Sequence, residues 1–222
     1  MYKTSFTNKV VSVAFAMLLA LFVITLSIGL PIYVRPFYYA QIDALDLEKE
    51  TGHTEEEIIE AYDELLDFLT LGKDFGVGAF PYSENGKSHF YDCKILFDLN
   101  FAVLATSLIL MLVILFTYKV KGEKIWRPFG LHVSFFSGIF TLLAFCFAGI
   151  FIFLNFDKAF LVFHSILFPG KKNWYFNTIT DPIILALPNQ FFMNAAFLII
   201  ASVMLISLSL IITSLINRDT RF

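Results

Sequence analysis

The 222-residue sequence has little of what soluble enzymes and disulfide-stabilised proteins use. Only 16% of its residues are charged, and it has two cysteines, Cys93 and Cys146. Two cysteines do not indicate a disulfide framework, so we expect each to be a small packing residue. With 58% hydrophobic residues and a mean hydropathy of +0.73, the chain is too apolar for an ordinary soluble domain. We therefore expect part of its surface to be in contact with membrane lipid.

Several motifs of nucleotide binding and catalysis are also missing. Gly72, Gly76 and Gly78 form a glycine-rich stretch, but no Gly-Lys-Ser/Thr pattern follows it and no Rossmann strand precedes it. Ser88 and Ser165 each stand beside a histidine, yet neither lies in a Gly-x-Ser-x-Gly elbow. No His-Glu-x-x-His pattern or clustered Cys/His spacing supports a metal site. We therefore expect neither a nucleotide nor a metal.

Four uninterrupted apolar runs are long enough to cross a bilayer, which takes about 20 helical residues. They cover about residues 10–34, 95–118, 129–154 and 191–216. Each must be a helix, because an α-helix satisfies its own backbone groups in lipid, and the alternating pattern of a membrane β-barrel is absent. The first run is too long for a signal peptide, so we interpret it as a retained anchor. The sequence thus predicts an all-α membrane protein: one integral membrane domain, residues 1–222, with four transmembrane helices.

The distribution of charge predicts the orientation of these helices. One face holds 8 of the 16 Lys and Arg residues but only 2 of the 19 Asp and Glu residues. Basic residues near span ends favour the cytoplasm, so this face should be inside, together with both termini. Two longer loops, 35–94 and 155–190, are then outside. The charged residues of the predicted inner face are Lys3, Lys9, Lys119, Lys121, Glu123, Lys124, Arg127, Arg218, Asp219 and Arg221.

Both outer loops should contain helical structure. In the first, Thr54 and Glu57 match a capping box, and the helix that follows has a stripe of apolar residues that should be buried as scaffold. In the second, the apolar stretch Ala159–Phe168 is too short to span the membrane, so it should be an interfacial or re-entrant segment. The stripe of the first loop consists of Ile58, Ile59, Tyr62, Leu65, Leu66 and Leu69.

The four histidines differ in their predicted surroundings. His132 lies near the inner end of the third span, where we expect it to bond a neighbouring helix, and His53 should be a surface residue. His89 stands where the second span enters the bilayer. His164 lies in an apolar stretch, where burial would keep its imidazole neutral and able to act as a base. Alternatively, His164 is a hydrogen-bonded core residue.

The polar neighbours of His89 allow two interpretations. Asp92 follows it by three residues, so on a helix the carboxylate can orient the imidazole or tune its pKa. In the other interpretation, Asp92 forms an interfacial salt bridge with Lys94.

Two segments around these histidines carry a family resemblance. Residues 89–97, His-Phe-Tyr-Asp-Cys-Lys-Ile-Leu-Phe, are similar to a pattern H-x-x-D-V-K-x-L-F, and residues 163–168 are similar to F-H-x-x-F-F. Trp174, Asp181 and Pro188 continue the second pattern. Over essentially its whole length, the chain resembles a family of small bacterial four-span proteins that includes the lipoprotein intramolecular transacylase of Gram-positive bacteria.

The chain departs from these patterns at two positions. Cys93 replaces a usual Val, and Leu167 replaces the first Phe of a pair. Both departures leave the polar positions of the motifs intact, although the surface that faces the substrate can differ from that of other members.

The resemblance implies an enzyme that moves the sn-2 acyl chain of a diacylglyceryl-modified amino-terminal cysteine to the α-amino group of that cysteine. An α-amine has a reference pKa of about 7.7–8.0, so a modest base suffices to activate it. His89 and His164 are then the acid/base pair, and which of them is the base stays open. The implied partners are diacylated bacterial lipoproteins and membrane lipid, with no cofactor and no nucleic acid. The implied location is the bacterial cell membrane, with the site at its outer face.

The supporting residues are less clear from the sequence. We expect Asp92 to orient His89, and Trp174 and Asp181 to shape the site. Arg35 can serve as an oxyanion donor or, alternatively, as an anchor at the end of the first span. The candidate oxyanion donors are Arg35, Tyr38, Tyr39 and backbone N–H groups.

Two alternative functions remain. One is a non-catalytic membrane protein that binds lipid or lipoprotein through its outer surface. The other is a metal-dependent membrane hydrolase, with ligands drawn from His89, Asp92, His164 and Asp181.

Overall fold

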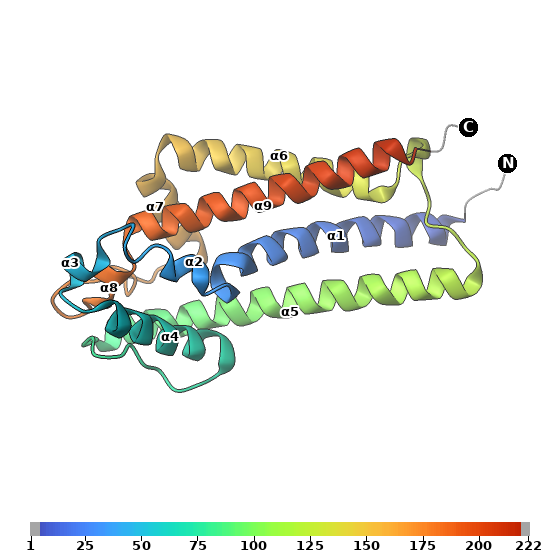
Figure 1. Cartoon of the computed structure of the whole chain (residues 1–222). Coiled ribbons are helices and arrows are strands. Elements are labelled where there is room, and N and C mark those ends of the chain that lie inside the picture. The colour runs from blue at the N-terminus through green and yellow to red at the C-terminus, as the bar shows by residue number, and fades with distance from the viewer. Residues whose placement is uncertain (1–4, 219–222) are drawn as a thin grey trace. The chain divides into compact units, whose positions relative to one another are not determined.

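The computed structural model of the chain describes residues 5–218 (Figure 1). Within this range all regular secondary structure is helical, and four helices are long and apolar enough to cross a membrane. The prediction of an all-α, multi-pass membrane protein is therefore confirmed. Lys3, Asp219 and Arg221, which entered the prediction of orientation, lie outside the described residues.

The elements follow one another as a series of helices, of which α1, α5, α6 and α9 are the candidate spans. In chain order the elements are α1 Phe6–Tyr33, α2 Pro36–Tyr39, α3 Leu47–Thr51, α4 Glu55–Leu71, α5 Glu84–Lys121, the 3₁₀ helix η1 Pro128–Gly130, α6 Val133–Leu154, α7 Phe156–Leu167, α8 Ile183–Ala186 and α9 Asn189–Ile216.

Two helix boundaries differ from the predicted spans. Helix α5 begins at Glu84, well before the predicted residue 95, because its first turns are polar and hydropathy alone does not detect them. Helix α6 begins at Val133 rather than 129. Phe129 and Gly130 have φ of 54° and 75°, a left-handed conformation in which an α-helix cannot continue.

The chain divides into two compact units. Unit 1 comprises Met1–Ile28, Phe101–Ile150 and Leu198–Phe222, and unit 2 comprises Gly29–Asn100 and Phe151–Phe197. The expectation of a single integral membrane domain stays a prediction.

Small and hydroxylated residues join the helices of unit 1. Ser137 Oγ of α6 donates to the carbonyl of Ala16 in α1 at 2.7 Å, and Thr141 Oγ1 lies 2.7 Å from Ser207 Oγ of α9. At Gly138 a Cβ would lie 2.8 Å from the Ser207 carbonyl oxygen, so α6 and α9 approach closely only because this residue is glycine. Such contacts hold helices together in lipid, where apolar burial provides little driving force.

His132 belongs to this unit. Its backbone N–H donates to Ser214 Oγ of α9 at 3.0 Å, and its ring Nδ1 lies 3.0 Å from Ser134 Oγ. The bond to the neighbouring helix therefore comes from the backbone, whereas the ring bonds within its own segment.

Unit 2 is built on the amphipathic helix α4. Thr54 and Glu57 form the predicted capping box, with both reciprocal hydrogen bonds present. The apolar stripe of α4 is buried against residues of both outer loops, including Leu47 and Ile183. Each fully buried aliphatic side chain contributes about 1.5–3 kcal/mol. The buried residues of α4 are Ile58, Ala61, Tyr62, Leu65, Leu66, Phe68 and Leu69, whereas Ile59 is half-buried.

Candidate functional site

The structure brings His89 and His164 together within unit 2. Their ring centroids are 5.9 Å apart, with 34° between the ring planes, and the residues are only 5% and 7% exposed. His89 lies near the start of α5, and His164 lies in the last turn of α7. With 12 residues, α7 is too short to span a bilayer, as predicted. The two segments similar to family motifs therefore form one site.

The surroundings of His164 determine its tautomer. Its Nδ1 lies 2.9 Å from the carbonyl oxygen of Phe160, one turn earlier in α7. A carbonyl can only accept, so the neutral imidazole carries its proton on Nδ1 and presents the lone pair of Nε2. Burial lowers the pKa of His164, and the hydrogen bond to Phe160 offsets this effect only in part. The ring is therefore a neutral base near pH 7.

His89 has a different arrangement of contacts. Its Nε2 lies 3.4 Å from the thiol sulfur of Cys93, which is one turn further along α5. Its Nδ1 is buried and has no hydrogen-bond partner. Within residues 5–218, one other buried side-chain nitrogen or oxygen lacks a partner, and that atom is Asn173 Oδ1.

Aromatic rings surround both imidazoles. The ring of Phe168 meets that of His89 edge-on at 4.9 Å and lies 5.7 Å from that of His164. Trp174 lies 4.8 Å from His164, and its indole N–H donates to the carbonyl of Lys171. Trp174 therefore packs directly on His164. In such apolar surroundings, hydrogen bonds and charges act more strongly than in water.

Asp92 does not hydrogen-bond His89. Its carboxylate accepts from Lys171 Nζ and, at 2.9 Å, from Asn173 Nδ2. The alternative salt bridge with Lys94 is also not formed, because Lys94 Nζ pairs with Asp98 at 3.4 Å. Asp92 instead joins α5 to the segment that follows α7. Sequence reasoning missed Asn173 altogether, because an isolated Asn in a loop has no pattern that singles it out.

Asp181 anchors the start of α5. It is 3% exposed, and its carboxylate accepts from Ser83 N at 2.7 Å, Ser83 Oγ at 2.8 Å and Thr180 Oγ1 at 2.7 Å. Ser83 Oγ in turn accepts from the N–H of Gly86, as an N-cap residue does. A Cβ at Gly86 would lie 2.2 Å from Asp181 Oδ1, so only glycine fits there. Asp181 thereby positions the first turns of α5, which carry His89.

The proposed oxyanion donors on the first outer loop are already paired. The guanidinium of Arg35 bonds Asp67 and lies 2.8 Å from Asp63. Tyr38 is fully buried, and its hydroxyl donates to the carbonyl of Ala186 at 2.8 Å. Tyr39 likewise donates to Asp63 at 2.7 Å. These contacts hold the core of unit 2 together, whereas His89 Nδ1 is a buried nitrogen of the site that has no hydrogen-bond partner within residues 5–218.

The acidic residues and histidines of the site do not form a metal centre. Across residues 5–218, no three His, Cys, Asp or Glu side chains are grouped so that they could hold an ion. The carboxylates of Asp92 and Asp181 are instead occupied by the hydrogen bonds described above.

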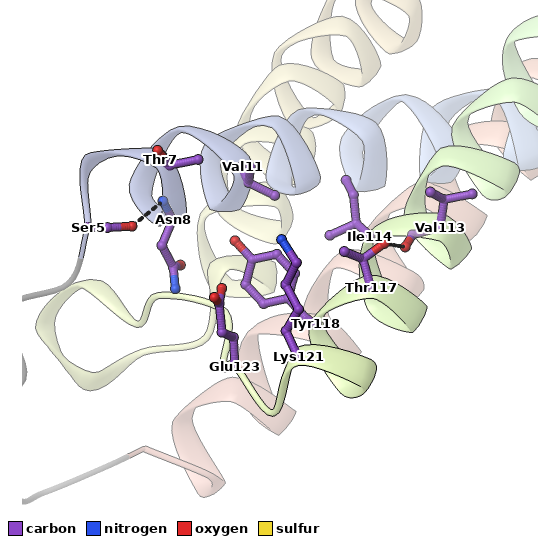
Figure 2. Close-up of a pocket in the computed structure, with 10 residues that line it drawn as sticks. All are labelled: Ser5, Thr7, Asn8, Val11, Val113, Ile114, Thr117, Tyr118, Lys121 and Glu123. Atoms are coloured by element: carbon purple, nitrogen blue, oxygen red, sulfur yellow. Dashed lines mark hydrogen bonds between the residues drawn. The ribbon is translucent and has the colours of Figure 1, made fainter.

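A separate pocket of about 300 Å³ lies in unit 1, between the start of α1 and the end of α5 (Figure 2). Asn8, Lys121 and Glu123 line it together with apolar residues such as Val11. None of the residues that line it belongs to the site predicted from the sequence.

Comparisons with known proteins identify the family and the fold of the chain. A family model described as lipoprotein intramolecular transacylase Lit matches residues 13–192. Among solved structures, the chain is similar to the membrane-integral lipoprotein intramolecular transacylase Lit from Bacillus cereus, with 24% identity, a TM-score of 0.85 and 95% of both chains covered.

Two variants of the same Bacillus cereus protein are similar at 25% identity. A histidine-to-arginine variant has a TM-score of 0.75, with 95% of this chain and 92% of that chain covered. A histidine-to-alanine variant has a TM-score of 0.74, with 95% and 94% covered. Among curated proteins, none matches at a significant level.

Proposed function

Because this chain belongs to the lipoprotein intramolecular transacylase family, we propose that His89 and His164 carry out its acyl transfer. The enzyme moves the sn-2 acyl chain of a diacylglyceryl-modified amino-terminal cysteine to the α-amino group of the same cysteine. The observation that carries the assignment is the pair of buried imidazoles, whose ring centroids are 5.9 Å apart. Among the described residues, the imidazole nitrogen without a hydrogen-bond partner is Nε2 in His164 and Nδ1 in His89.

His164 acts as the base and then as the acid. Its free Nε2 removes a proton from the amine as the amine nitrogen attacks the ester carbonyl carbon. When the tetrahedral intermediate collapses, the bond between carbon and glycerol oxygen breaks, and His164 returns the proton to that oxygen. The lowered pKa of His164 favours this return, because it makes the imidazolium a stronger acid. No proton is gained or lost overall.

His89 stabilises the oxyanion of the intermediate. We assign the thiol of Cys93 as the donor to Nε2, 3.4 Å away, and under this assignment the neutral ring of His89 carries its proton on Nδ1. This unpaired N–H is then a donor for the negative charge that develops on the carbonyl oxygen. Since it has no competing partner in the described chain, it needs no rearrangement when the charge forms.

The aromatic surroundings serve an intramolecular reaction. Nucleophile and ester belong to one substrate molecule, so holding them in reach supplies a large effective molarity. Water would hydrolyse the same ester, and the rings of Phe168 and Trp174 limit its access to the imidazoles. No cofactor is needed to convert an ester into an amide.

The exposed side of α7 supports a membrane-bound substrate. His164 is buried, whereas Phe163 and Ile166 of the same helix are 55% and 70% exposed. These apolar side chains suit contact with lipid and with the acyl chains of a lipoprotein. One candidate span separates each of the loops 35–94 and 155–190 from the inner loop, which supports a location of both loops on the same side of the membrane. The basic residues of the inner face support an outer location for them.

Replacing either histidine tests the proposal. In a bilayer with a synthetic diacylated lipopeptide, His164→Ala should slow transfer at least about 100-fold through loss of the base, and His89→Ala by a similar factor through loss of the oxyanion donor. Mass spectrometry of the lipopeptide measures the N-acyl product. His53→Ala is the matched control, because His53 pairs with Glu57 and should leave the rate unchanged. Full activity in both His164→Ala and His89→Ala would contradict the proposal.

A further inference from the structure

Asn173 Oδ1 is a buried acceptor that the proposed mechanism does not use. Within residues 5–218, two buried side-chain nitrogen or oxygen atoms have no hydrogen-bond partner. They are Asn173 Oδ1 and His89 Nδ1. Proteins pair nearly all such atoms, because an unpaired one has lost its hydration without a replacement. Two buried polar atoms, one on His89 and one on Asn173, therefore lack a partner within the described residues.

The contacts of Asn173 determine which way its amide faces. Asn173 Nδ2 donates to Asp92 Oδ2 at 2.9 Å and to Ser88 Oγ at 3.3 Å. An ionised carboxylate can only accept, so the nitrogen must face Asp92 and the amide cannot be reversed. Lys171, bound to the other oxygen of Asp92, keeps this carboxylate in place. Asn173 Oδ1 is thus held as an acceptor by the bond between Nδ2 and Asp92.

Asn173 also lies among residues that neighbour His89 and His164. Ser88 and Asp92, which it bonds, stand on either side of His89 in α5. The next residue, Trp174, packs on His164 with 4.8 Å between ring centroids. The acceptor therefore belongs to the histidine site.

We propose that Asn173 Oδ1 binds the nucleophile by accepting a hydrogen bond from the α-amino group of the substrate cysteine. This inference rests on the proposed function. A neutral primary amine has two N–H bonds and one lone pair: the lone pair attacks the ester carbon, one proton goes to His164, and the other N–H stays on Asn173 Oδ1. In the product, this second hydrogen remains as the amide N–H. Asn173 itself neither gains nor loses a proton.

This role makes the enzyme selective for a primary amine. A secondary amine has a single N–H, which must be given to His164, so none is left for Asn173. The test compares a diacylated lipopeptide with a free α-amine and the same lipopeptide with an N-methylated α-amine. The full-length enzyme in a bilayer should have a kcat/KM about tenfold lower for the methylated substrate, beyond any steric effect, because one hydrogen bond is lost.

Asn173→Ala should lower kcat/KM for the primary amine. The ratio of kcat/KM for the primary amine to kcat/KM for the N-methylated amine should come about tenfold closer to one. The ratio comes from one preparation of each variant, so partial misfolding cancels from it. Asn177→Ala, an exposed asparagine of the same loop, should keep the wild-type ratio. Ser88→Ala removes an anchor of Asn173 Nδ2 but not Oδ1, and should keep the ratio too.

Three outcomes count against this role. An unchanged ratio in Asn173→Ala overturns it while the transacylase assignment stands. A Ser88→Ala variant that shifts the ratio as much as Asn173→Ala overturns it as well, because loop packing would then cause the effect. If the wild-type enzyme fails to convert even the primary amine, the proposed function fails and this inference fails with it.

Discussion

At the scale of residues, one hydrogen bond distinguishes the proposed roles of the two histidines. The carbonyl of Phe160 can only accept, so it places the proton of His164 on Nδ1 and leaves Nε2 as a base. Because burial lowers the pKa of this imidazole, it stays unprotonated to a lower pH than an exposed histidine. The site is therefore suited to act on an amine that titrates only slightly above neutral pH.

This lowered pKa predicts the pH dependence of the reaction. Protonation of the substrate amine should make log(kcat/KM) fall with a slope of one below about 7.7–8.0. Protonation of His164 removes the base in turn, so a slope of two should begin only below about pH 6.5, the ordinary value for histidine. Initial rates across pH 5–9, measured by mass spectrometry, check this. A slope of two already present above pH 6.5 would contradict the pKa direction.

At the scale of elements, each histidine depends on where its helix begins. Helix α7 starts after Asn155, whose side chain accepts from the N–H of Lys158 at 2.9 Å, as an N-cap. Helix α5 starts after Ser83, which Asp181 holds from a distant part of the chain. The relative position of the two imidazoles in unit 2 therefore depends on hydrogen bonds at helix ends.

Removing the carboxylate of Asp181 should disturb the start of α5. Asp181→Ala leaves the N–H of Ser83 and two hydroxyl groups without their acceptor, which should cost about 1–3 kcal/mol of stability. Transacylation should also slow, since the first turns of α5 carry His89. Thermal unfolding in detergent and the product assay measure the two effects. Asp43→Ala, at an exposed carboxylate, should change neither, and a wild-type melting temperature in Asp181→Ala would refute the anchoring role.

At the scale of the whole molecule, the four candidate spans within residues 5–218 and the uneven distribution of charge support a proposed orientation in the membrane. An even number of spans returns the chain to the side where it started. From the charge asymmetry we propose that the segments with His89 and His164 are outside, on the side opposite the basic loop between α5 and α6. A lipoprotein anchored in the outer leaflet would meet the site from that side.

Cysteine labelling in intact cells tests this topology. In a background with Cys93→Val and Cys146→Ala, we expect a membrane-impermeant maleimide to label Glu60→Cys, on the exposed side of α4. Lys124→Cys, in the loop between α5 and α6, should react only after the membrane is permeabilised. The reverse pattern would invert the orientation and place the histidines on the cytoplasmic side.

The sequence by itself determined the features that depend on neighbouring residues. Runs of about 20 apolar residues define the spans, the spacing of Thr54 and Glu57 defines a capping box, and the helical period defines the buried stripe of α4. His89 and His164 stood out for similar local reasons. Their joint role, however, came from a family resemblance, since no short-range pattern connects two residues so far apart in the chain.

Only the tertiary structure decided which distant groups meet. Asp92 appeared to belong with His89, three residues away, yet its carboxylate binds Lys171 and Asn173, 79 and 81 positions further along. Asp181 was expected to shape the site, and its carboxylate binds Ser83, 98 positions before it. The physical reason is that buried polar groups at helix ends and in loops must form hydrogen bonds, and their partners are the groups that the folded loops bring close. These partners cannot be predicted from the spacing of residues in the sequence.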